Sequence, residues 1–491
     1  MLKSAMSEGA LSESNVDGAA GSGLLADAVL SGVGAGVSEG LRESVWGVLA
    51  DPQAVRAALA SEGHVDARRR VLTGEVTVMT VLGLCLFSGE GYDSVLARVV
   101  PGLVPGAAVP TGSALSLARG RLAGQPLKAL FDAVVGTPVA ASVPGGQAFG
   151  LELTAVDGTC MDLPATAEVS AEFATPTGGK YPQARLVTLV SCGTRRVHAA
   201  TVGSYATSEQ KLFDELVPAL GPGTLNLGDR NFFSMARWVT AAATGAQLAW
   251  RVKNGARSLP AKVIAVLSDG STLVRLRESN SMLARRRTAA GDRTLPRLPD
   301  TIARLVEFNV HVTDEAGRTR TSRFRVLTTL VDHEAYPARE IAAVYAERWQ
   351  VELAYYRMKV TLRGPGIVLR GQTPALARQE IWGLLVVYNA LCDLATRTAV
   401  HLQAAPHQIS FVAVLRRTRT HLDTPTRPCH CRRGQDADPT QTLVTAIAAH
   451  PRNRTDRQRT SPRTTRQRQT ERTRNVEYTI TIVTSNLPKA T

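Results

Sequence analysis

The stretch YAERWQVELAYYRMK, residues 345–359, carries polar side chains at a regular spacing: Tyr345, Arg348, Glu352 and Lys359. At about 100° per residue of an α-helix, these four side chains lie within an arc of about 60°. A solvent-exposed charged face is one interpretation, with Arg348 and Glu352 paired at i, i+4 and contributing a few tenths of a kcal/mol. The other side of this helix carries Ala, Val, Trp and Leu, which favours an ordered polar stripe that faces a cleft.

Two aspartates follow apolar segments that are typical of β-strands. Asp157 follows LELTAV and precedes Gly158, and Asp229 follows TLNLG. The carboxyl ends of strands are where α/β sheets place functional groups, although Asp-Gly and Gly-Asp are also ordinary turn sequences. Taken singly, each aspartate favours a turn, whereas together with Glu352 they supply three carboxylates.

Three carboxylates with cations nearby suit the chemistry of DNA strand cleavage and joining. Two hard divalent cations need oxygen ligands that bring negative charge. In two-metal chemistry one ion activates a water or a 3′-hydroxyl, and the other stabilises the leaving oxygen of a phosphodiester. Arg348 and Lys359 can hold phosphates, and Tyr345 can donate a hydrogen bond to one. We therefore expect the three carboxyl groups to lie close enough to share metal ions.

The elements that must position these residues form a mixed α/β sheet. Strands are predicted at 151–157, 184–192, 195–203, 224–229 and 246–252. Helices are predicted at 208–220, 232–244, 338–360 and 378–397. Strands in a run that then alternate with helices are typical of a mixed sheet. Residues 260–335 predict a β-rich insert of further strands, with the basic segment 282–297 as a loop between them.

The first part of the chain predicts helices. Residues 1–37 are rich in small residues and predict a disordered N-terminus, and residues 38–136 predict a helical, DNA-binding domain. Two helical segments flank a Pro/Gly-rich turn at 101–112, which allows a helix-turn-helix. Its second helix would offer Arg119 and Arg121 to phosphate. A plain helical bundle explains the same pattern equally well.

The charge of the chain favours a polyanionic partner. The 491 residues carry a formal net charge of +15, which indicates nucleic acid or a membrane surface. Residues 401–491 hold 16 basic and 6 acidic side chains, so most of the excess lies there. We expect a basic, low-complexity tail that either binds phosphate without sequence preference or is simply a solvated segment.

Cysteine usage and hydropathy exclude other classes. Six Cys in a chain of this length do not suggest a disulfide scaffold. The group Cys429-His430-Cys431 is too tightly spaced for the usual C-x₂-C zinc knuckle, which favours free thiols in a reducing cytosol. The apolar run at 24–37 is short and interrupted by Asp27, so no membrane span is expected.

The spacing of the polar stripe is a known signature. It has the form Tyr345-x₂-Arg348-x₃-Glu352-x₆-Lys359. With it the chain resembles insertion-sequence DDE transposases of the Y-R-E-K signature, insertion sequence family four. Similar to the two aspartate motifs of that family are Asp157-Gly158-Thr159 and Gly228-Asp229-Arg230-Asn231-Phe232. The resemblance covers about residues 50–400.

The resemblance implies a ribonuclease H-like catalytic domain at 150–400, with the insert at about 260–335. The implied catalytic and metal-binding residues are Asp157, Asp229 and Glu352, with two Mg²⁺ or Mn²⁺ ions. The implied DNA-binding residues are Tyr345, Arg348 and Lys359. Members of the family cut the inverted-repeat ends of their element and insert it at a new target by hydrolysis and transesterification. They act on double-stranded DNA as a synaptic homodimer, which implies a bacterial cytoplasmic protein at the nucleoid.

Two features depart from the family pattern. An aromatic of the insert can stabilise a flipped base in such enzymes, and no Trp lies between residues 251 and 348. Ser461-Pro462-Arg463 resembles a basic element near the family's C-terminus, but Arg/Thr/Gln repetition surrounds it. Two alternatives therefore stay open: a catalytically decayed DNA-binding derivative, and a two-metal nuclease without strand transfer. The sequence has no Gly-rich nucleotide loop, Walker lysine or Ser/His/Asp set, which argues against a metabolic enzyme.

Overall fold

The computed structural model describes residues 45–64, 66, 70–135, 143, 146–255, 259–313, 318–423, 438–449 and 477–484. Three sequence predictions lie outside these described residues. They are the disordered N-terminus at 1–37, the group Cys429-His430-Cys431, and the basic element Ser461-Pro462-Arg463.

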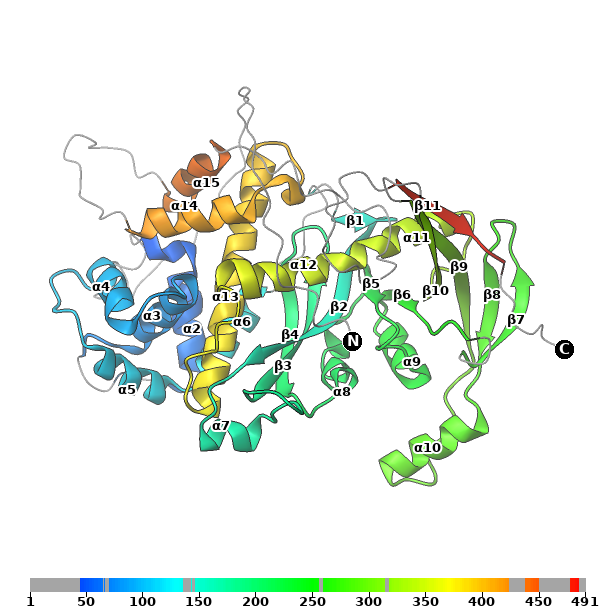
Figure 1. Cartoon of the computed structure of the whole chain (residues 1–491), viewed down its shortest axis with the longest axis horizontal. Coiled ribbons are helices and arrows are strands. Elements are labelled where there is room, and N and C mark those ends of the chain that lie inside the picture. The colour runs from blue at the N-terminus through cyan, green and yellow to red at the C-terminus, as the bar shows by residue number, and fades with distance from the viewer. Residues whose placement is uncertain are drawn as a thin grey trace.

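The described chain opens with a bundle of helices, drawn in blue to cyan in Figure 1. Its members are η1 (Val45–Val48), α2 (Pro52–Ser61), α3 (Gly74–Leu86), α4 (Tyr92–Leu103), α5 (Gly112–Leu122) and α6 (Gln125–Val135). The helix α3 is capped by Thr73 and is buried from Val76 onward, because apolar residues occupy nearly every side of it. It packs against α4 and against the later helix α13 (Pro374–His401).

The helices α4 and α5 do not form a helix-turn-helix. Residues 104–111 separate them, which is longer than the three- or four-residue turn of that motif. The bundle shares one apolar core with α13 and with one face of the sheet. The helical prediction for this region is thus confirmed, and the plain bundle describes it.

One sheet runs through the rest of the molecule (Figure 1). Its strands are β1 (Gln147–Ala148), β2 (Leu151–Asp162), β3 (Gln183–Ser191), β4 (Val197–Ser204), β5 (Thr224–Gly228), β6 (Gln247–Arg251), β7 (Ala261–Val266), β8 (Thr272–Leu276), β9 (Thr301–Thr313), β10 (Thr319–Thr328) and β11 (Glu477–Ile482). The order is β4-β3-β2-β5-β6-β10-β9-β8-β7, with β1 on β2 and β11 on β9. Strands β2, β5 and β6 are parallel, and the other pairs are antiparallel.

Alternation along the strands divides the interior between two cores. On β2, Leu153 and Ala155 join the core that includes α13, whereas Val156 joins the core on the opposite face. Successive side chains of a strand point to opposite faces, so a strand buried on both sides is continuously apolar. The buried residues of α8 (Glu209–Asp214), η2 (Val217–Ala219) and α9 (Met235–Ala243) belong to the core that contains Val156, whereas α7 (Ala167–Glu172) adds to the core that includes α13.

The insert is β-rich, as expected, and it extends the same sheet, but its basic segment is not a loop. The helix α10 (Asn280–Ala290) occupies most of the segment that the sequence predicted as a loop. Ser279 caps its first turn by accepting from the Met282 N–H, and Gly291 ends it in the left-handed conformation. The loop prediction was wrong because α10 has no buried residue and therefore no apolar period.

A nearly continuous helical run follows the insert and carries the polar stripe. It comprises α11 (Ala338–Ala346), the 3₁₀ turn η3 (Glu347–Trp349), α12 (Gln350–Tyr356) and the π-helical turn η4 (Arg357–Leu362). The predicted helix at 378–397 lies inside α13. Both helix predictions are confirmed. Within the described part of the chain, no helix combines the length and apolar character needed to span a membrane.

The prediction of a low-complexity tail at 401–491 is wrong for its described parts. After η5 (Pro406–Gln408), the helix α14 (Phe411–Asp423) buries Phe411 and Leu415, and α15 (Pro439–Ala448) buries Leu443 and Ile447. The strand β11 pairs with β9 in the insert. Averaged over this region, the basic composition conceals short apolar stripes that add to the core.

Candidate active site

Asp157 lies inside β2 and does not end it, because the strand continues to Asp162. Its Oδ1 accepts from the Gly158 N–H at 2.8 Å. A Cβ on Gly158 would lie only 2.7 Å from Cγ and Cδ of Glu209. The Glu209 side chain thus packs closely against Gly158. The turn interpretation of Asp157-Gly158 is wrong, because both residues lie within β2.

Asp229 follows directly on β5, as the sequence predicted. Its Oδ1 accepts from the Arg230 N–H at 2.6 Å. In the parallel pair of β2 and β5, Val156 stands opposite Gly228. Asp157 and Asp229 are the next residues on these two strands, so neighbouring strands bring them to the same level of the sheet.

Two tyrosines tie the helical run to these strands. The Tyr345 hydroxyl donates to the Gly228 carbonyl at 3.2 Å, immediately before Asp229. The Tyr355 hydroxyl donates to the carbonyl of Asp157 at 2.6 Å. Glu352 lies between them on the run, and its Oε1 accepts from Nη2 of Arg348 at 2.9 Å.

Arg348 supplies the positive charge that the three carboxylates share. Burial opposes the charge of this guanidinium, yet its neighbours raise its pKa above the ordinary value: Tyr345, Glu352, Asp157 and Asp229. Burial raises the pKa of Asp157 to about 7, with Arg348 acting against the shift and Glu352 adding to it. The charge of Asp157 is thus poorly stabilised here.

The carboxylates are not gathered as tightly as the sequence analysis expected. Among the described residues, no three acidic, histidine or cysteine side chains stand close enough to enclose a metal ion. Arg348 provides the neutralising charge in this arrangement. The donor set of Asp157, Asp229 and Glu352 nevertheless suits Mg²⁺ or Mn²⁺, because all its donors are hard carboxylate oxygens.

Lys359, the last residue of the polar stripe, contacts the backbone of β2. Its Nζ donates to the Cys160 carbonyl at 2.8 Å and lies 3.3 Å from Oγ1 of Thr159. These contacts fix the π-helical turn η4 onto the strand that carries Asp157. A DNA contact by Lys359 stays a prediction.

The two N-terminal arginines have different surroundings. Arg119 is 1 % exposed, and its Nε donates to Oε1 of Gln379 on α13 at 2.8 Å. Its guanidinium also donates to the Tyr92 hydroxyl. The predicted phosphate contact of Arg119 is therefore wrong for this arrangement, since the side chain joins α4, α5 and α13. Arg121 is exposed, and its predicted DNA contact stays a prediction.

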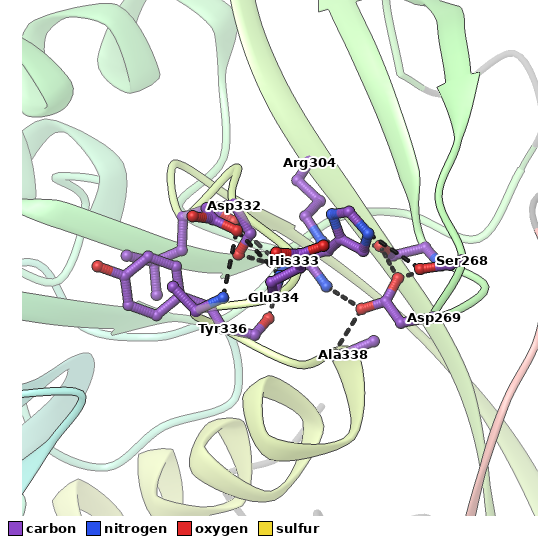
Figure 2. A network of polar contacts seen from close by, with 11 residues as sticks. Ser268, Asp269, Arg304, Asp332, His333, Glu334, Tyr336 and Ala338 are labelled. Carbon is purple, nitrogen blue, oxygen red and sulfur yellow. Dashed lines mark hydrogen bonds and ion pairs between the residues drawn. The ribbon is translucent and has the colours of Figure 1, made fainter.

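The insert holds the start of the helical run (Figure 2). Pro337 precedes α11 and gives it no side-chain cap. Instead, a carboxylate oxygen of Asp269, in the turn between β7 and β8, accepts from the Ala338 N–H at 2.8 Å. Asp269 thus caps a helix that lies far from it in the sequence.

A buried arginine completes this latch, which we define as Asp269, Ser271 and Arg304 with the chain from Leu330 to Ala338. Arg304 has no exposed surface, and it donates to Asp269, to Oγ of Ser271 at 2.7 Å and to the Tyr336 carbonyl at 2.6 Å. Although burial acts against it, the hydrogen bonds from Ser271 and Ala338 and the charge of Arg304 lower the pKa of Asp269. The latch fixes the start of the helical run, and this run carries Tyr345, Arg348 and Glu352.

Comparison with known proteins shows two family matches. The model described as insertion element 4 transposase N-terminal matches residues 44–132, and the model described as transposase DDE domain matches residues 148–390. A curated relative from Escherichia coli K12, the transposase InsG for insertion sequence element IS4, is 29 % identical over 373 residues, 74 % of this chain and 78 % of its own length.

The chain belongs to the insertion element 4 family of DDE transposases. It is thus an insertion-sequence transposase, an enzyme that cleaves DNA and transfers strands. The sheet order β4-β3-β2-β5-β6 and the DDE match confirm the ribonuclease H-like fold. A solved piggyBac transposase synaptic complex with hairpin DNA gives a TM-score of 0.38 at 10 % identity, covering 83 % of this chain and 85 % of that one. That likeness is too weak to support a conclusion.

Sequence reasoning missed two residues at the site of this transposase. Glu209 approaches Asp157-Gly158, and its Oε2 accepts from Nδ2 of Asn231 at 2.9 Å, beside Asp229. It begins α8 after the cap Ser208, so in the sequence it looks like an ordinary acid of a first helical turn. The sequence could have indicated Tyr355, because it lies about 20° from Arg348 on a helical wheel, at the border of the polar stripe.

Proposed function

We propose that this transposase moves its insertion sequence by cut and paste, with Asp157, Asp229 and Glu352 as the ligands of two Mg²⁺ or Mn²⁺ ions. The observation that carries the proposal is the placement of these carboxylates, within β2, directly after β5 and on α12, around the guanidinium of Arg348. When bound, such ions would activate the attacking water or 3′-hydroxyl and stabilise the leaving oxygen.

Four other residues of the site have separate roles in this proposal. Arg348 neutralises the carboxylates without metal, and cations at the site would free it to contact a DNA phosphate. Tyr345 and Tyr355 hold the helical run against β5 and β2, so they set the position of Glu352. Lys359 holds the next turn against β2 and is the second candidate for a phosphate contact.

We further propose that the DNA partners are the terminal inverted repeats of the element and a target duplex. Each protomer of a synaptic homodimer would act on one end. Bringing two ends together before cleavage requires two active sites, and this chain supplies one set of three carboxylates. We place the enzyme at the bacterial nucleoid because its substrate is chromosomal DNA.

The test is a cleavage and joining assay with purified full-length protein, Mg²⁺, DNA that carries the ends of its own element, and a target plasmid. Glu352→Gln removes the proposed ligand, and Glu340→Gln, at an exposed position of the same helical run, is the matched control. Wild type and Glu340→Gln should cut at the element boundary and join the end to the plasmid, whereas Glu352→Gln should do neither.

Two other outcomes would replace the proposal. Cutting without joining would identify a two-metal nuclease. Binding of the end DNA without cutting by the wild type would identify a decayed DNA-binding derivative. Equal cutting by wild type and Glu352→Gln would remove Glu352 from the site.

A further inference from the structure

The two aspartates of the site are held in different ways. The parallel pairing of β2 with β5 ends where Val156 stands opposite Gly228, and β5 itself ends there. The strand β2 continues to Asp162, so Asp157 lies within the sheet, whereas Asp229 is the first residue of a loop. The hydrogen bonds between these two strands therefore stop before they could fix Asp229 against β2.

The loop that begins with Asp229 is anchored to the start of α8. Nε2 of Gln210 donates to Oδ1 of Asn231 at 2.6 Å and to its carbonyl at 3.1 Å. Nδ2 of Asn231 donates to Oε2 of Glu209 at 2.9 Å. Ser208 caps this turn of α8. Two consecutive helix residues thus hold both ends of the Asn231 amide, two positions after Asp229.

Glu209 is the residue of this anchor that also reaches β2. Its Cγ and Cδ lie against Gly158, 2.7 Å from where a Cβ on that glycine would stand. Its Oε1 lies 3.6 Å from Nη1 of Arg185 on β3, and only 14 % of the Glu209 side chain is exposed. One side chain therefore contacts the strand of Asp157, the strand next to it, and the loop of Asp229.

Glu209 supports the site from behind. Successive residues of a strand face opposite sides, so the side of Gly158 that Glu209 contacts is opposite to the Asp157 side chain. Val156 packs on that side with Phe213 of α8. Burial is the main cause of the raised pKa of Asp157, and the negative charge of Glu209 adds to it. Glu209 is thus close to the site but approaches it from the far face of the strand.

We propose that Glu209 is a positioning residue for the transposase reaction, which sets the place of Asp229 relative to Asp157 through its hydrogen bond to Asn231. The inference rests on the proposed function, since it takes the two aspartates to be metal ligands. Groups that orient ligands from behind in this way typically contribute about 10- to 100-fold to metal affinity. Glu209 acts through the Asn231 amide and not as a ligand itself.

The test measures Mn²⁺ binding to the full chain by electron paramagnetic resonance of the free ion, so that DNA cleavage is not the readout. Glu209→Ala should weaken binding about 10- to 100-fold. Glu209→Gln should restore nearly wild-type binding, because its amide oxygen can still accept from Asn231. Asn231→Ala should reproduce the loss, and adding Glu209→Ala to it should weaken binding no further, since the two residues act as one pair.

The matched control is Glu168→Ala, which removes an exposed acid from the first turn of α7, another short capped helix. It should bind Mn²⁺ as the wild type does, and thermal unfolding in EDTA checks that each variant folds. Equal losses in Glu209→Ala and Glu209→Gln would overturn the inference, because Glu209 would then act through its charge as a ligand.

Two further outcomes separate this inference from the proposed function. Loss of Mn²⁺ binding in Asp229→Asn beside unchanged binding in Glu209→Ala would overturn the positioning role and leave the metal ligands in place. Unchanged binding in Asp229→Asn, or no binding by the wild type, would remove the proposed ligands and the positioning role together.

Discussion

The insert and the catalytic core each place an aspartate near an arginine, Asp269 with Arg304 and Asp157 with Arg348. In the insert, all three nitrogens of the Arg304 guanidinium donate to oxygen atoms, and hydrogen bonds lower the pKa of Asp269. In the core, the Arg348 guanidinium interacts with Asp157, Asp229 and Glu352, and burial raises the pKa of Asp157 to about 7.

The difference separates a pair that stabilises the fold from a group of charges kept for chemistry. The latch satisfies its polar atoms within the chain, so its ionised form is the favoured one. In the core the charge of the buried Asp157 is poorly compensated, with Glu352 and Glu209 adding negative charge, which destabilises the protein without metal but prepares a place for cations. Excess like charge of this kind is typical of functional sites. The predictions below test this contrast.

The largest effect should come from Arg304→Met in the latch. Removing one partner of a buried ion pair leaves an uncompensated charge and unpaired carbonyls, which costs about 3–5 kcal/mol of unfolding free energy. Denaturant titration followed by circular dichroism measures the change. The control Arg275→Met, at an exposed position of β8, should change the unfolding free energy by about 0.5 kcal/mol or less.

Asp269→Asn should lower the unfolding free energy by about 1–3 kcal/mol, because it weakens the cap on α11 and the pair with Arg304. The loss should be local, with faster amide exchange at the start of α11 than in α13, measured by hydrogen–deuterium exchange. Asp300→Asn is the control, since its oxygen lies 3.9 Å from Arg277 near the surface. Equal exchange in both variants would contradict the capping role.

Asp157→Asn should change the unfolding free energy in the opposite direction to Asp269→Asn. Without metal at pH 8, the substitution removes a poorly stabilised charge and should raise the unfolding free energy by about 1 kcal/mol. It should also abolish DNA cleavage. Thermal unfolding in EDTA measures the first effect. A fall in stability similar to that of Asp269→Asn would show that the two aspartates do not differ in kind.

The last prediction concerns the pH dependence of stability. A carboxyl with a raised pKa in the folded state binds its proton more tightly there, so its contribution to stability falls as pH rises from about 4 to about 7. Asp269, whose pKa is lowered, contributes above about pH 4 and loses that contribution as pH falls further. Metal-free Asp157→Asn should therefore show a flatter stability profile between about pH 4 and about pH 7 than the wild type, whereas Asp269→Asn should not.

Local patterns predicted the strands of the core and insert and the helical run. Apolar alternation and the spacing of Tyr345, Arg348 and Glu352 are short-range signals, and they were sufficient for these elements. The burial of Arg119 was not predictable, because its hydrogen-bond partner Gln379 is 260 positions away. Nor was the latch, since Asp269 caps a helix that begins 69 positions later.

The helices α10, α14 and α15 were also not predicted from the sequence, for other physical reasons. The helix α10 lacks an apolar period because it buries nothing, so only its cap Ser279 and its terminal Gly291 could have indicated it. The helices α14 and α15 are short apolar stripes within a region whose composition is basic overall. Composition reports the average over a region, whereas burial depends on the spacing of a few residues such as Phe411 and Leu443.

Because β11 pairs with β9, this part of the sheet can be completed only after residues 477–482 have been synthesised. Residues 308–313 of β9 have β10 on one side, and their other neighbour is residues 477–482, which are synthesised much later. At the usual pace of translation, that edge waits roughly 10–30 s for its partner strand. A nascent or truncated chain that ends before Glu477 leaves this edge open, and open strand edges are templates for aggregation. A stop codon late in the gene should therefore reduce the yield of folded transposase even where every catalytic residue has been made.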